Sequence, residues 1–99
     1  MLNEVSESTF RPHIGTTFTV AAGTDQIALE LRAVEAASQE AMTGPQGRVP
    51  FSLIFKGPSQ RSLQQGIHAL HHESIGDLEI FLVPIQPGGD WAEYEAVFN

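Results

Sequence analysis

Cysteine is absent from this chain of 99 residues, and only five of its residues are Lys or Arg. Without thiols the protein has no disulfide bond, no cysteine nucleophile and no thiolate metal site. A small fold of this kind must be held together by packing or by assembly. The reducing cytoplasm suits such a chain, and we expect the protein to be located there.

The scarcity of basic residues leaves the chain strongly acidic. Twelve Asp and Glu residues against five Lys and Arg give a formal net charge of −7 at pH 7. A charge of this sign repels both the phosphate backbone of nucleic acids and an anionic membrane surface. We therefore expect neither nucleic acid nor membrane as a partner.

Long apolar runs are also missing. No stretch approaches the roughly 18 apolar residues that a membrane-spanning helix needs. Residues 1–9 are polar and acidic and do not resemble a secretory leader, so we expect a flexible N-terminal lead followed by one β domain over residues 10–99. Charged residues make up 17% of the chain, below the usual value of about 25%, which hints that part of the surface contacts a partner.

Alternating apolar residues are the strongest positive signal in the sequence. Side chains in a strand point to opposite faces in turn, so Phe51, Leu53 and Phe55 fall on one face of the run 49–56. The runs 77–85 and 93–98 alternate in the same way. In 77–85 both faces are apolar, because Leu78 lies on one face of the strand and Phe81 on the other. This pattern suggests a central strand covered from both sides.

The stretch 26–42 is ambiguous between strand and helix. It is rich in helix-forming Ala, Leu and Glu, yet Ile27, Leu29, Leu31 and Ala33 alternate with more polar residues. We predict a strand to about Ala36, with a helix as the alternative, and a loop over 37–48. Weaker strands are predicted at 16–21 and 67–72.

Six short strands separated by Gly and Pro turns predict an all-β fold. The spacing of the strands indicates a six-stranded antiparallel sandwich or a small, partly open barrel.

Several segments together resemble a family of small bacterial single-domain proteins of unknown function. They read PFSLIFKGP at 50–58, LQQGIHALHHESIG at 63–76, IFLVPIQP at 80–87 and YEAVFN at 94–99. The resemblance implies that residues 27–34 are extended. It also implies a structural or assembly role, because members are often encoded beside proteins that carry a phage-tail-collar-like domain. The family brings no catalytic residues, and it usually has an aromatic residue in place of His68, which suggests a substituted packing position.

Histidines gather at 68–72 and raise the question of a metal site. On a helix, His68 and His72 would lie one turn apart, close enough to share a zinc ion. On a strand they would stand ~13 Å apart, too far for direct shared coordination. We predict a strand and therefore partly packed histidines. The alternative is a metal site formed by His68 and His72 with His13 or Asp77.

Aromatic residues near the C-terminus are candidates for partner binding, because aromatic anchors often supply most of the energy of an interface. We single out Trp91, Tyr94 and Phe81, with the alternative that Trp91 covers the core of its own domain.

The chain contains neither a nucleophile elbow nor a phosphate-binding loop. We expect no catalytic residue and no cofactor. Our leading hypothesis is a non-catalytic structural or protein-interaction module that binds a protein partner or a second copy of itself. The alternative is a small ligand-binding or metal-dependent enzyme that uses the histidine and acidic cluster.

Overall fold

The computed structural model describes residues 7–22, 25–36, 50–58, 63–85 and 91–98. After a helical turn, α1, and a 3-10 turn, η2, six strands follow. Their bounds are α1 Glu7–Phe10, η2 Arg11–His13, β1 Thr17–Ala22, β2 Asp25–Ala36, β3 Phe51–Pro58, β4 Gly66–His72, β5 Gly76–Pro84 and β6 Trp91–Phe98. The predicted loop 37–48 and the first six residues of the predicted lead lie outside the described residues. Neither helical turn is long and apolar enough to cross a membrane.

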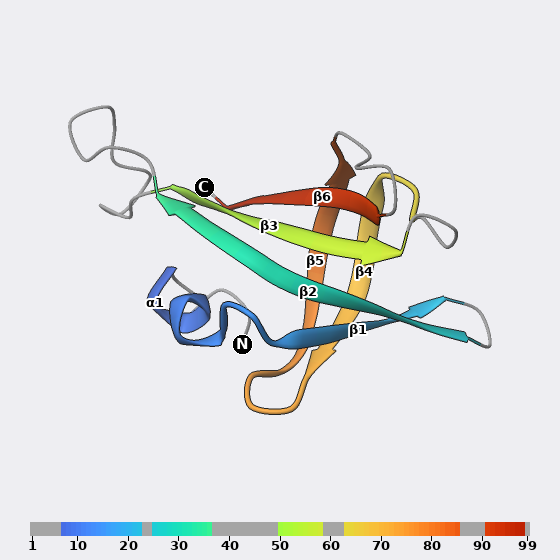
Figure 1. The fold of residues 1–99 in the computed structure, drawn as a ribbon, viewed down its shortest axis with the longest axis horizontal. Coiled ribbons are helices and arrows are strands. Elements are labelled where there is room, and N and C mark those ends of the chain that lie inside the picture. The colour runs from blue at the N-terminus through green and yellow to red at the C-terminus, as the bar shows by residue number, and fades with distance from the viewer. Residues whose placement is uncertain (1–6, 23–24, 37–49, 59–62, 86–90, 99) are drawn as a thin grey trace.

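The six strands close into a small antiparallel barrel in the order β1-β2-β3-β6-β5-β4, which confirms the all-β prediction. Long ladders join β1, β2, β3 and β6 into one sheet, and another long ladder joins β4 to β5. The β4–β5 hairpin runs across the other strands (Figure 1). It meets the sheet at two short seams: β4 registers with β1 at two positions, and β5 registers with β6 at two positions.

The ambiguous stretch forms strand β2, so the helical alternative is wrong for residues 25–36. Ile27, Leu29 and Leu31 point into the core as predicted. The predicted inward position of Ala33 is wrong, because the β2–β3 register shifts between Leu31 and Ala33 and turns Val34 inward. Such a bulge inserts one extra residue and bends the strand, which helps a sheet to curve toward closure.

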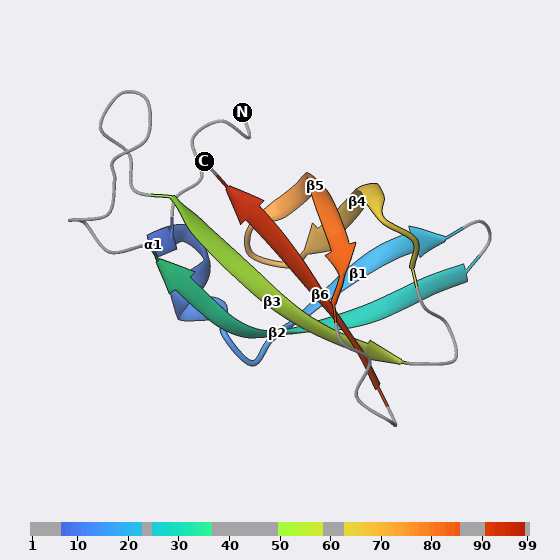
Figure 2. The ribbon, with the colours of Figure 1, turned by 90° about the horizontal axis from the view of Figure 1, so that it is seen from above.

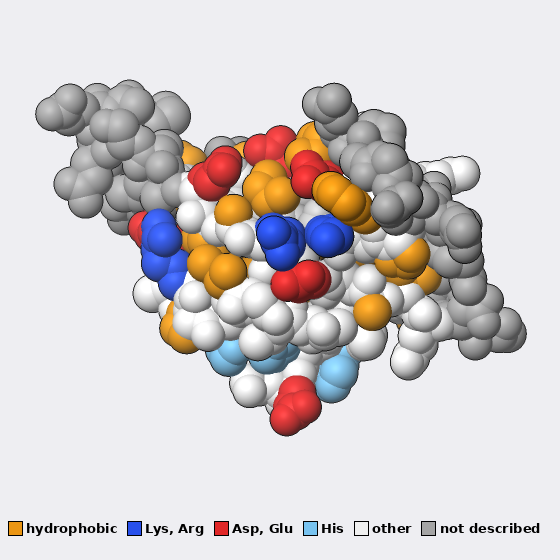
Figure 3. Space-filling model, viewed as in Figure 1, with side chains coloured by type: hydrophobic (Ala, Val, Ile, Leu, Met, Phe, Trp, Pro, Cys, Tyr) orange, Lys and Arg blue, Asp and Glu red, His pale blue; other side chains and the backbone are white. Residues whose placement is uncertain are grey.

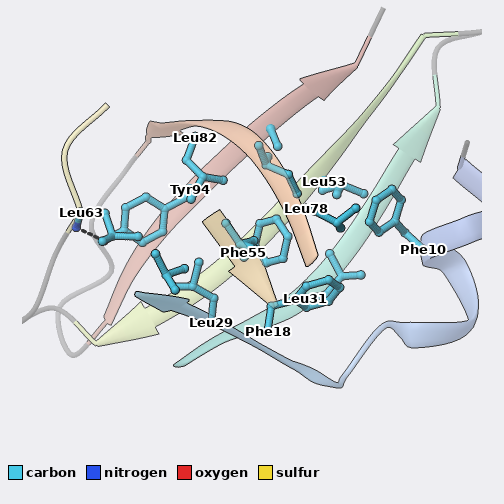
Figure 4. Packing of buried hydrophobic residues seen from close by; sticks show 14 of the residues in the cluster. Phe10, Phe18, Leu29, Leu31, Leu53, Phe55, Leu63, Leu78, Leu82 and Tyr94 are labelled. Atoms are coloured by element: carbon cyan, nitrogen blue, oxygen red, sulfur yellow. Dashed lines mark hydrogen bonds between the residues drawn. The ribbon is translucent and has the colours of Figure 1, made fainter. Parts of the chain in front are cut away.

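The core fills the barrel with the inward side chains of all six strands (Figure 4). Strand β3 shows the alternation clearly: Phe51, Leu53 and Phe55 are buried, and the residues between them are half-buried. Leu78, Ile80 and Leu82 of β5 are buried in the same way. The period of two in these runs therefore marked the correct inner face.

The prediction that β5 is covered on both faces is wrong at Phe81. Its side chain is 48% exposed on the outer side of the barrel. Among the described residues, β5 pairs along its length with β4, whereas its registered contact with β6 is confined to Val83 and Pro84. No second layer of described residues therefore covers Phe81 on the outer side of β5.

Helical turn α1 closes one end of the barrel through a single side chain. Phe10 is fully buried, and its ring centroid lies 6.4 Å from that of Phe18, 6.1 Å from that of Phe51 and 5.8 Å from that of Phe98. Phe51 and Phe98 stack on each other at 4.8 Å. A four-residue helix is not stable alone in water, so the burial of Phe10 holds α1 in place.

Replacing Phe10 with Ala should lower the free energy of unfolding by about 3–5 kcal/mol, because a fully buried ring is lost and a cavity remains. Urea denaturation followed by near-ultraviolet circular dichroism measures this loss. The control is Arg11→Ala, which removes an exposed ion pair with Glu7 and should cost at most about 1 kcal/mol. Equal stability of the two variants would show that Phe10 does not close the barrel.

Candidate functional site

Three cross-strand pairs on the β4–β5 hairpin point away from the core. Leu70, Leu78, Ile80 and Leu82 are buried, so the residues that alternate with them face outward. We call these outward residues the β4–β5 outer face; they are Ile67 opposite Phe81, Ala69 opposite Glu79, and His71 opposite Asp77.

One end of the β4–β5 outer face is apolar. Ile67 is 70% exposed and Phe81 is 48% exposed. Because these residues are directly opposite each other in the ladder, their side chains form one continuous apolar patch. Single apolar residues scattered over a surface are normal, and the pairing of these two residues is what makes the patch a candidate contact surface.

The other end of the β4–β5 outer face is acidic. Asp77 and Glu79 are exposed, and the Nδ1 atom of His71 lies 2.6 Å from Oδ1 of Asp77. This end borders a pocket of about 350 Å³. The pocket is lined by Thr19, Ala21, Gln26, Ala69, Leu70, His71, Asp77, Leu78 and Glu79. None of these described lining residues is Lys or Arg.

A second group of polar residues lies beneath the β4–β5 turn and centres on His72, whose side chain is only 5% exposed. Its Nδ1 atom accepts the backbone N–H of Ser74 at 2.9 Å and that of Ile75 at 3.3 Å. The Nε2 atom therefore carries the proton of the neutral ring and donates it to Oγ1 of Thr16 at 2.9 Å. The Thr16 hydroxyl in turn donates to the backbone carbonyl of His13 at 2.6 Å.

The surroundings of His72 favour its neutral form. Burial lowers the pKa of His72, and nearby His13 lowers it further, whereas Glu73 raises it and His71 adds a smaller lowering effect. The ring also packs between aromatic neighbours. Its centroid lies 4.5 Å from the ring centroid of Phe18 and 4.6 Å from that of His13. His72 therefore acts as a packed and hydrogen-bonded core residue.

The structure brings only two of the four predicted metal ligands together. His13 and His72 are in ring contact, but both ring nitrogens of His72 already hold hydrogen bonds. His68 Nε2 lies 2.7 Å from the carbonyl oxygen of Gln64, and Asp77 contacts His71. The described residues hold no group of three or more side chains that could bind a metal ion. The side chains of the alternative metal site, His68 and His72 with His13 or Asp77, therefore hold separate contacts among the described residues. Figure 3 shows the histidines near the β4–β5 turn, at the lower edge of that view.

The three predicted aromatic anchors lie in different surroundings. Tyr94 is 1% exposed, and its hydroxyl accepts the backbone N–H of Leu63 at 2.7 Å (Figure 4), so its prediction as a surface anchor is wrong. Trp91 is half-buried outside the core, with the ammonium group of Lys56 4.4 Å from its ring centroid. Phe81 is exposed and belongs to the apolar patch.

Ile67 was missed by the sequence reasoning. A signal was present, because Ile67 and Leu70 are three residues apart and must lie on opposite faces of a strand. Since Leu70 belongs to the core, Ile67 had to face outward.

Comparison with known families agrees with the resemblance to an uncharacterised group. A domain of unknown function, DUF6916, matches residues 5–98. The chain belongs to this family. No curated protein and no solved structure gives a significant match. The function of this DUF6916 domain must therefore be argued from its own geometry.

The DUF6916 domain should lose stability as the pH falls below 6.5, the ordinary pKa of histidine. Because the pKa of His72 is lowered in the fold, the unfolded chain binds more protons than the folded chain between the two pKa values. The contribution of His72 is complete above pH 6.5 and is lost as the pH falls through the lowered folded value. Urea denaturation at several values between about pH 5 and pH 8 measures this loss.

In the variant His72→Gln this part of the pH dependence should disappear, because the side chain no longer titrates. The matched control is His68→Gln, which removes a half-buried histidine from the same strand and should keep the wild-type slope. An unchanged slope in His72→Gln would contradict the assignment of the acid sensitivity to His72.

Proposed function

We propose that this DUF6916 chain is a non-catalytic protein-interaction module that serves as a structural or assembly component of a larger complex. The observation that carries the proposal is the exposed pair Ile67 and Phe81 on the β4–β5 outer face. Fully burying side chains of this size contributes about 1.5–3 kcal/mol each. Covering the pair with a partner would therefore supply a large part of a binding energy.

The state of the polar groups supports a binding role over catalysis. Among the described residues, no buried side-chain nitrogen or oxygen lacks a hydrogen-bond partner. A catalytic group usually needs a shifted pKa and an unoccupied position in a cleft. His72, whose pKa is shifted, instead uses both ring nitrogens to hold the β4–β5 turn and Thr16.

The sequence resemblance supports a more specific context. Members of the similar family are often encoded beside proteins with a phage-tail-collar-like domain. We propose that the partner belongs to a phage-tail-like fibre system and that the complex assembles in the cytoplasm. The acidic net charge of −7 favours a basic surface on such a partner.

Size-exclusion chromatography with light scattering tests the proposal at tens of micromolar. The protein is run alone and together with the protein that its neighbouring gene encodes. We expect either a complex of the two proteins or a defined oligomer of this chain. A strict monomer that forms no complex with the neighbouring protein would contradict the proposed function.

The variants Ile67→Ser and Phe81→Ser should each weaken that association by at least about tenfold, because each removes an apolar anchor from the interface. Their free energies of unfolding should stay within about 0.5 kcal/mol of the wild type, since both side chains are already exposed. Ile14→Ser is the matched control, because Ile14 is an exposed isoleucine outside the β4–β5 hairpin. Equal weakening by Ile14→Ser would show that the apolar patch is not the interface.

A further inference from the structure

The seam between β1 and β4 is only partly formed. Thr19 registers with His71 and Val20 with Leu70. If the ladder continued, Ala21 would register with Ala69. Among the described residues, no such pair follows, although β1 continues to Ala22 and β4 begins at Gly66. The two strands therefore separate toward the start of β4, and no described residue of β1 pairs with this part of its edge.

The direction of the backbone groups on this edge follows from the neighbouring ladders. Ile85 N–H donates to the carbonyl of Glu93 on β6, so the odd-numbered residues of β5 direct their backbone groups toward β6. The even-numbered residues of β5 then bond to β4, where their partners include His68 and Leu70. On β4 the odd-numbered residues Ile67 and Ala69 consequently direct their N–H and C=O groups toward the seam.

The pocket of about 350 Å³ lies at this seam. Ala21 and Gln26 of the β1–β2 hairpin form one wall, and Asp77 and Glu79 of β5 form the other. Figures 1 and 2 both show β1 and β2 projecting past the rest of the barrel. Leu70 and Leu78 also line the space, but only through the small part of each that is exposed, 1% for Leu70 and 5% for Leu78. The space thus combines a stretch of strand edge that β1 does not pair, a small apolar area and an acidic wall.

Charge decides which occupant fits this space. Glu79 and Asp77 are exposed carboxylates, and the described lining residues include neither Lys nor Arg. A second copy of this chain would bring its own net charge of −7 to an acidic wall, and like charges at an interface cost binding energy. An extended segment with basic side chains satisfies both this edge of β4 and the carboxylates.

We infer that an extended peptide segment of a protein partner, with basic and apolar residues in alternation, adds to β4 as an extra strand at Ile67 and Ala69. Its backbone completes the ladder that β1 leaves unfinished. Its basic side chains lie against Asp77 and Glu79, and its apolar side chains lie on the side of Leu70 and Leu78. This inference rests on the proposed function and specifies the chemistry of the partner.

A blocked synthetic peptide of about nine residues with alternating Lys and Val serves as the probe, since a strand of that length exceeds the part of the β4 edge that β1 does not pair. Calorimetry measures its affinity for the full chain, and hydrogen exchange followed by nuclear magnetic resonance measures protection of individual amides. We expect the peptide to bind and to slow exchange at the N–H groups of Ile67 and Ala69. A Glu–Val peptide of the same length should not bind. A Lys–Val peptide whose Lys residues carry N-methylated backbone amides should not bind either, because these residues share the outer face with Ile67 and Ala69 and their amides can then donate no ladder hydrogen bond.

The double variant Asp77→Asn with Glu79→Gln should weaken binding of the Lys–Val peptide by at least about tenfold and reduce its salt dependence. The control Glu35→Gln with Glu93→Gln removes the same charge at two positions that do not line the pocket and should leave the affinity within about twofold. Binding that leaves the exchange of Ile67 and Ala69 unchanged, or that responds equally to both double variants, would overturn the inference.

The two proposals fail in different ways. If the natural complex depends on Ile67 and Phe81 but is unaffected by the change at Asp77 and Glu79, the interaction module stands and the strand-addition inference falls. If the chain instead dimerises and the dimer protects the amides of Ile67 and Ala69, a second copy is the occupant and the inference of a basic partner is overturned. If no complex or oligomer forms, the proposed function itself fails.

Discussion

Two short seams hold the β4–β5 hairpin against the four-stranded sheet, and the other features of the molecule depend on how far these seams close. Where they close, at Val20 with Leu70 and at Val83 with Glu95, the barrel excludes water from a continuous core. Where the strands separate, strand edges and outward side chains remain at the surface. Phe10 completes the enclosure at one end, so a chain without disulfide bonds keeps a closed apolar interior.

The same closure explains why the polar residues of the chain divide into two roles. Inside the barrel, His72 and Tyr94 use their polar atoms to bind backbone N–H groups, because an unpaired polar group in the core costs about 1–3 kcal/mol. Outside, Asp77 and Glu79 remain exposed next to the part of the β4 edge that β1 does not pair. The inward residues His72 and Tyr94 therefore serve stability, whereas the recognition that we propose relies on outward residues of the β4–β5 hairpin.

The strands and much of the core could be predicted because alternation is a local property of the sequence. Phe51, Leu53 and Phe55 alternate within one run, and their common face is buried whatever the other strands do. The error at Ala33 has a different origin, because a bulge depends on the pairing of β2 with β3. The role of His72 was equally inaccessible, since its partner Thr16 is 56 residues away in the sequence.

The sequence by itself determined that this protein is a small acidic all-β domain, because composition and a period of two need no knowledge of distant contacts. Only the tertiary structure decided which aromatic residues face outward: Tyr94 points inward to Leu63, whereas Phe81 is exposed beside Ile67. It also decided that the ladder between β1 and β4 does not extend beyond the pair Val20 and Leu70 toward the start of β4. The physical reason is that exposure and edge pairing depend on how far two strands run side by side, and this depends on how the whole barrel curves and closes.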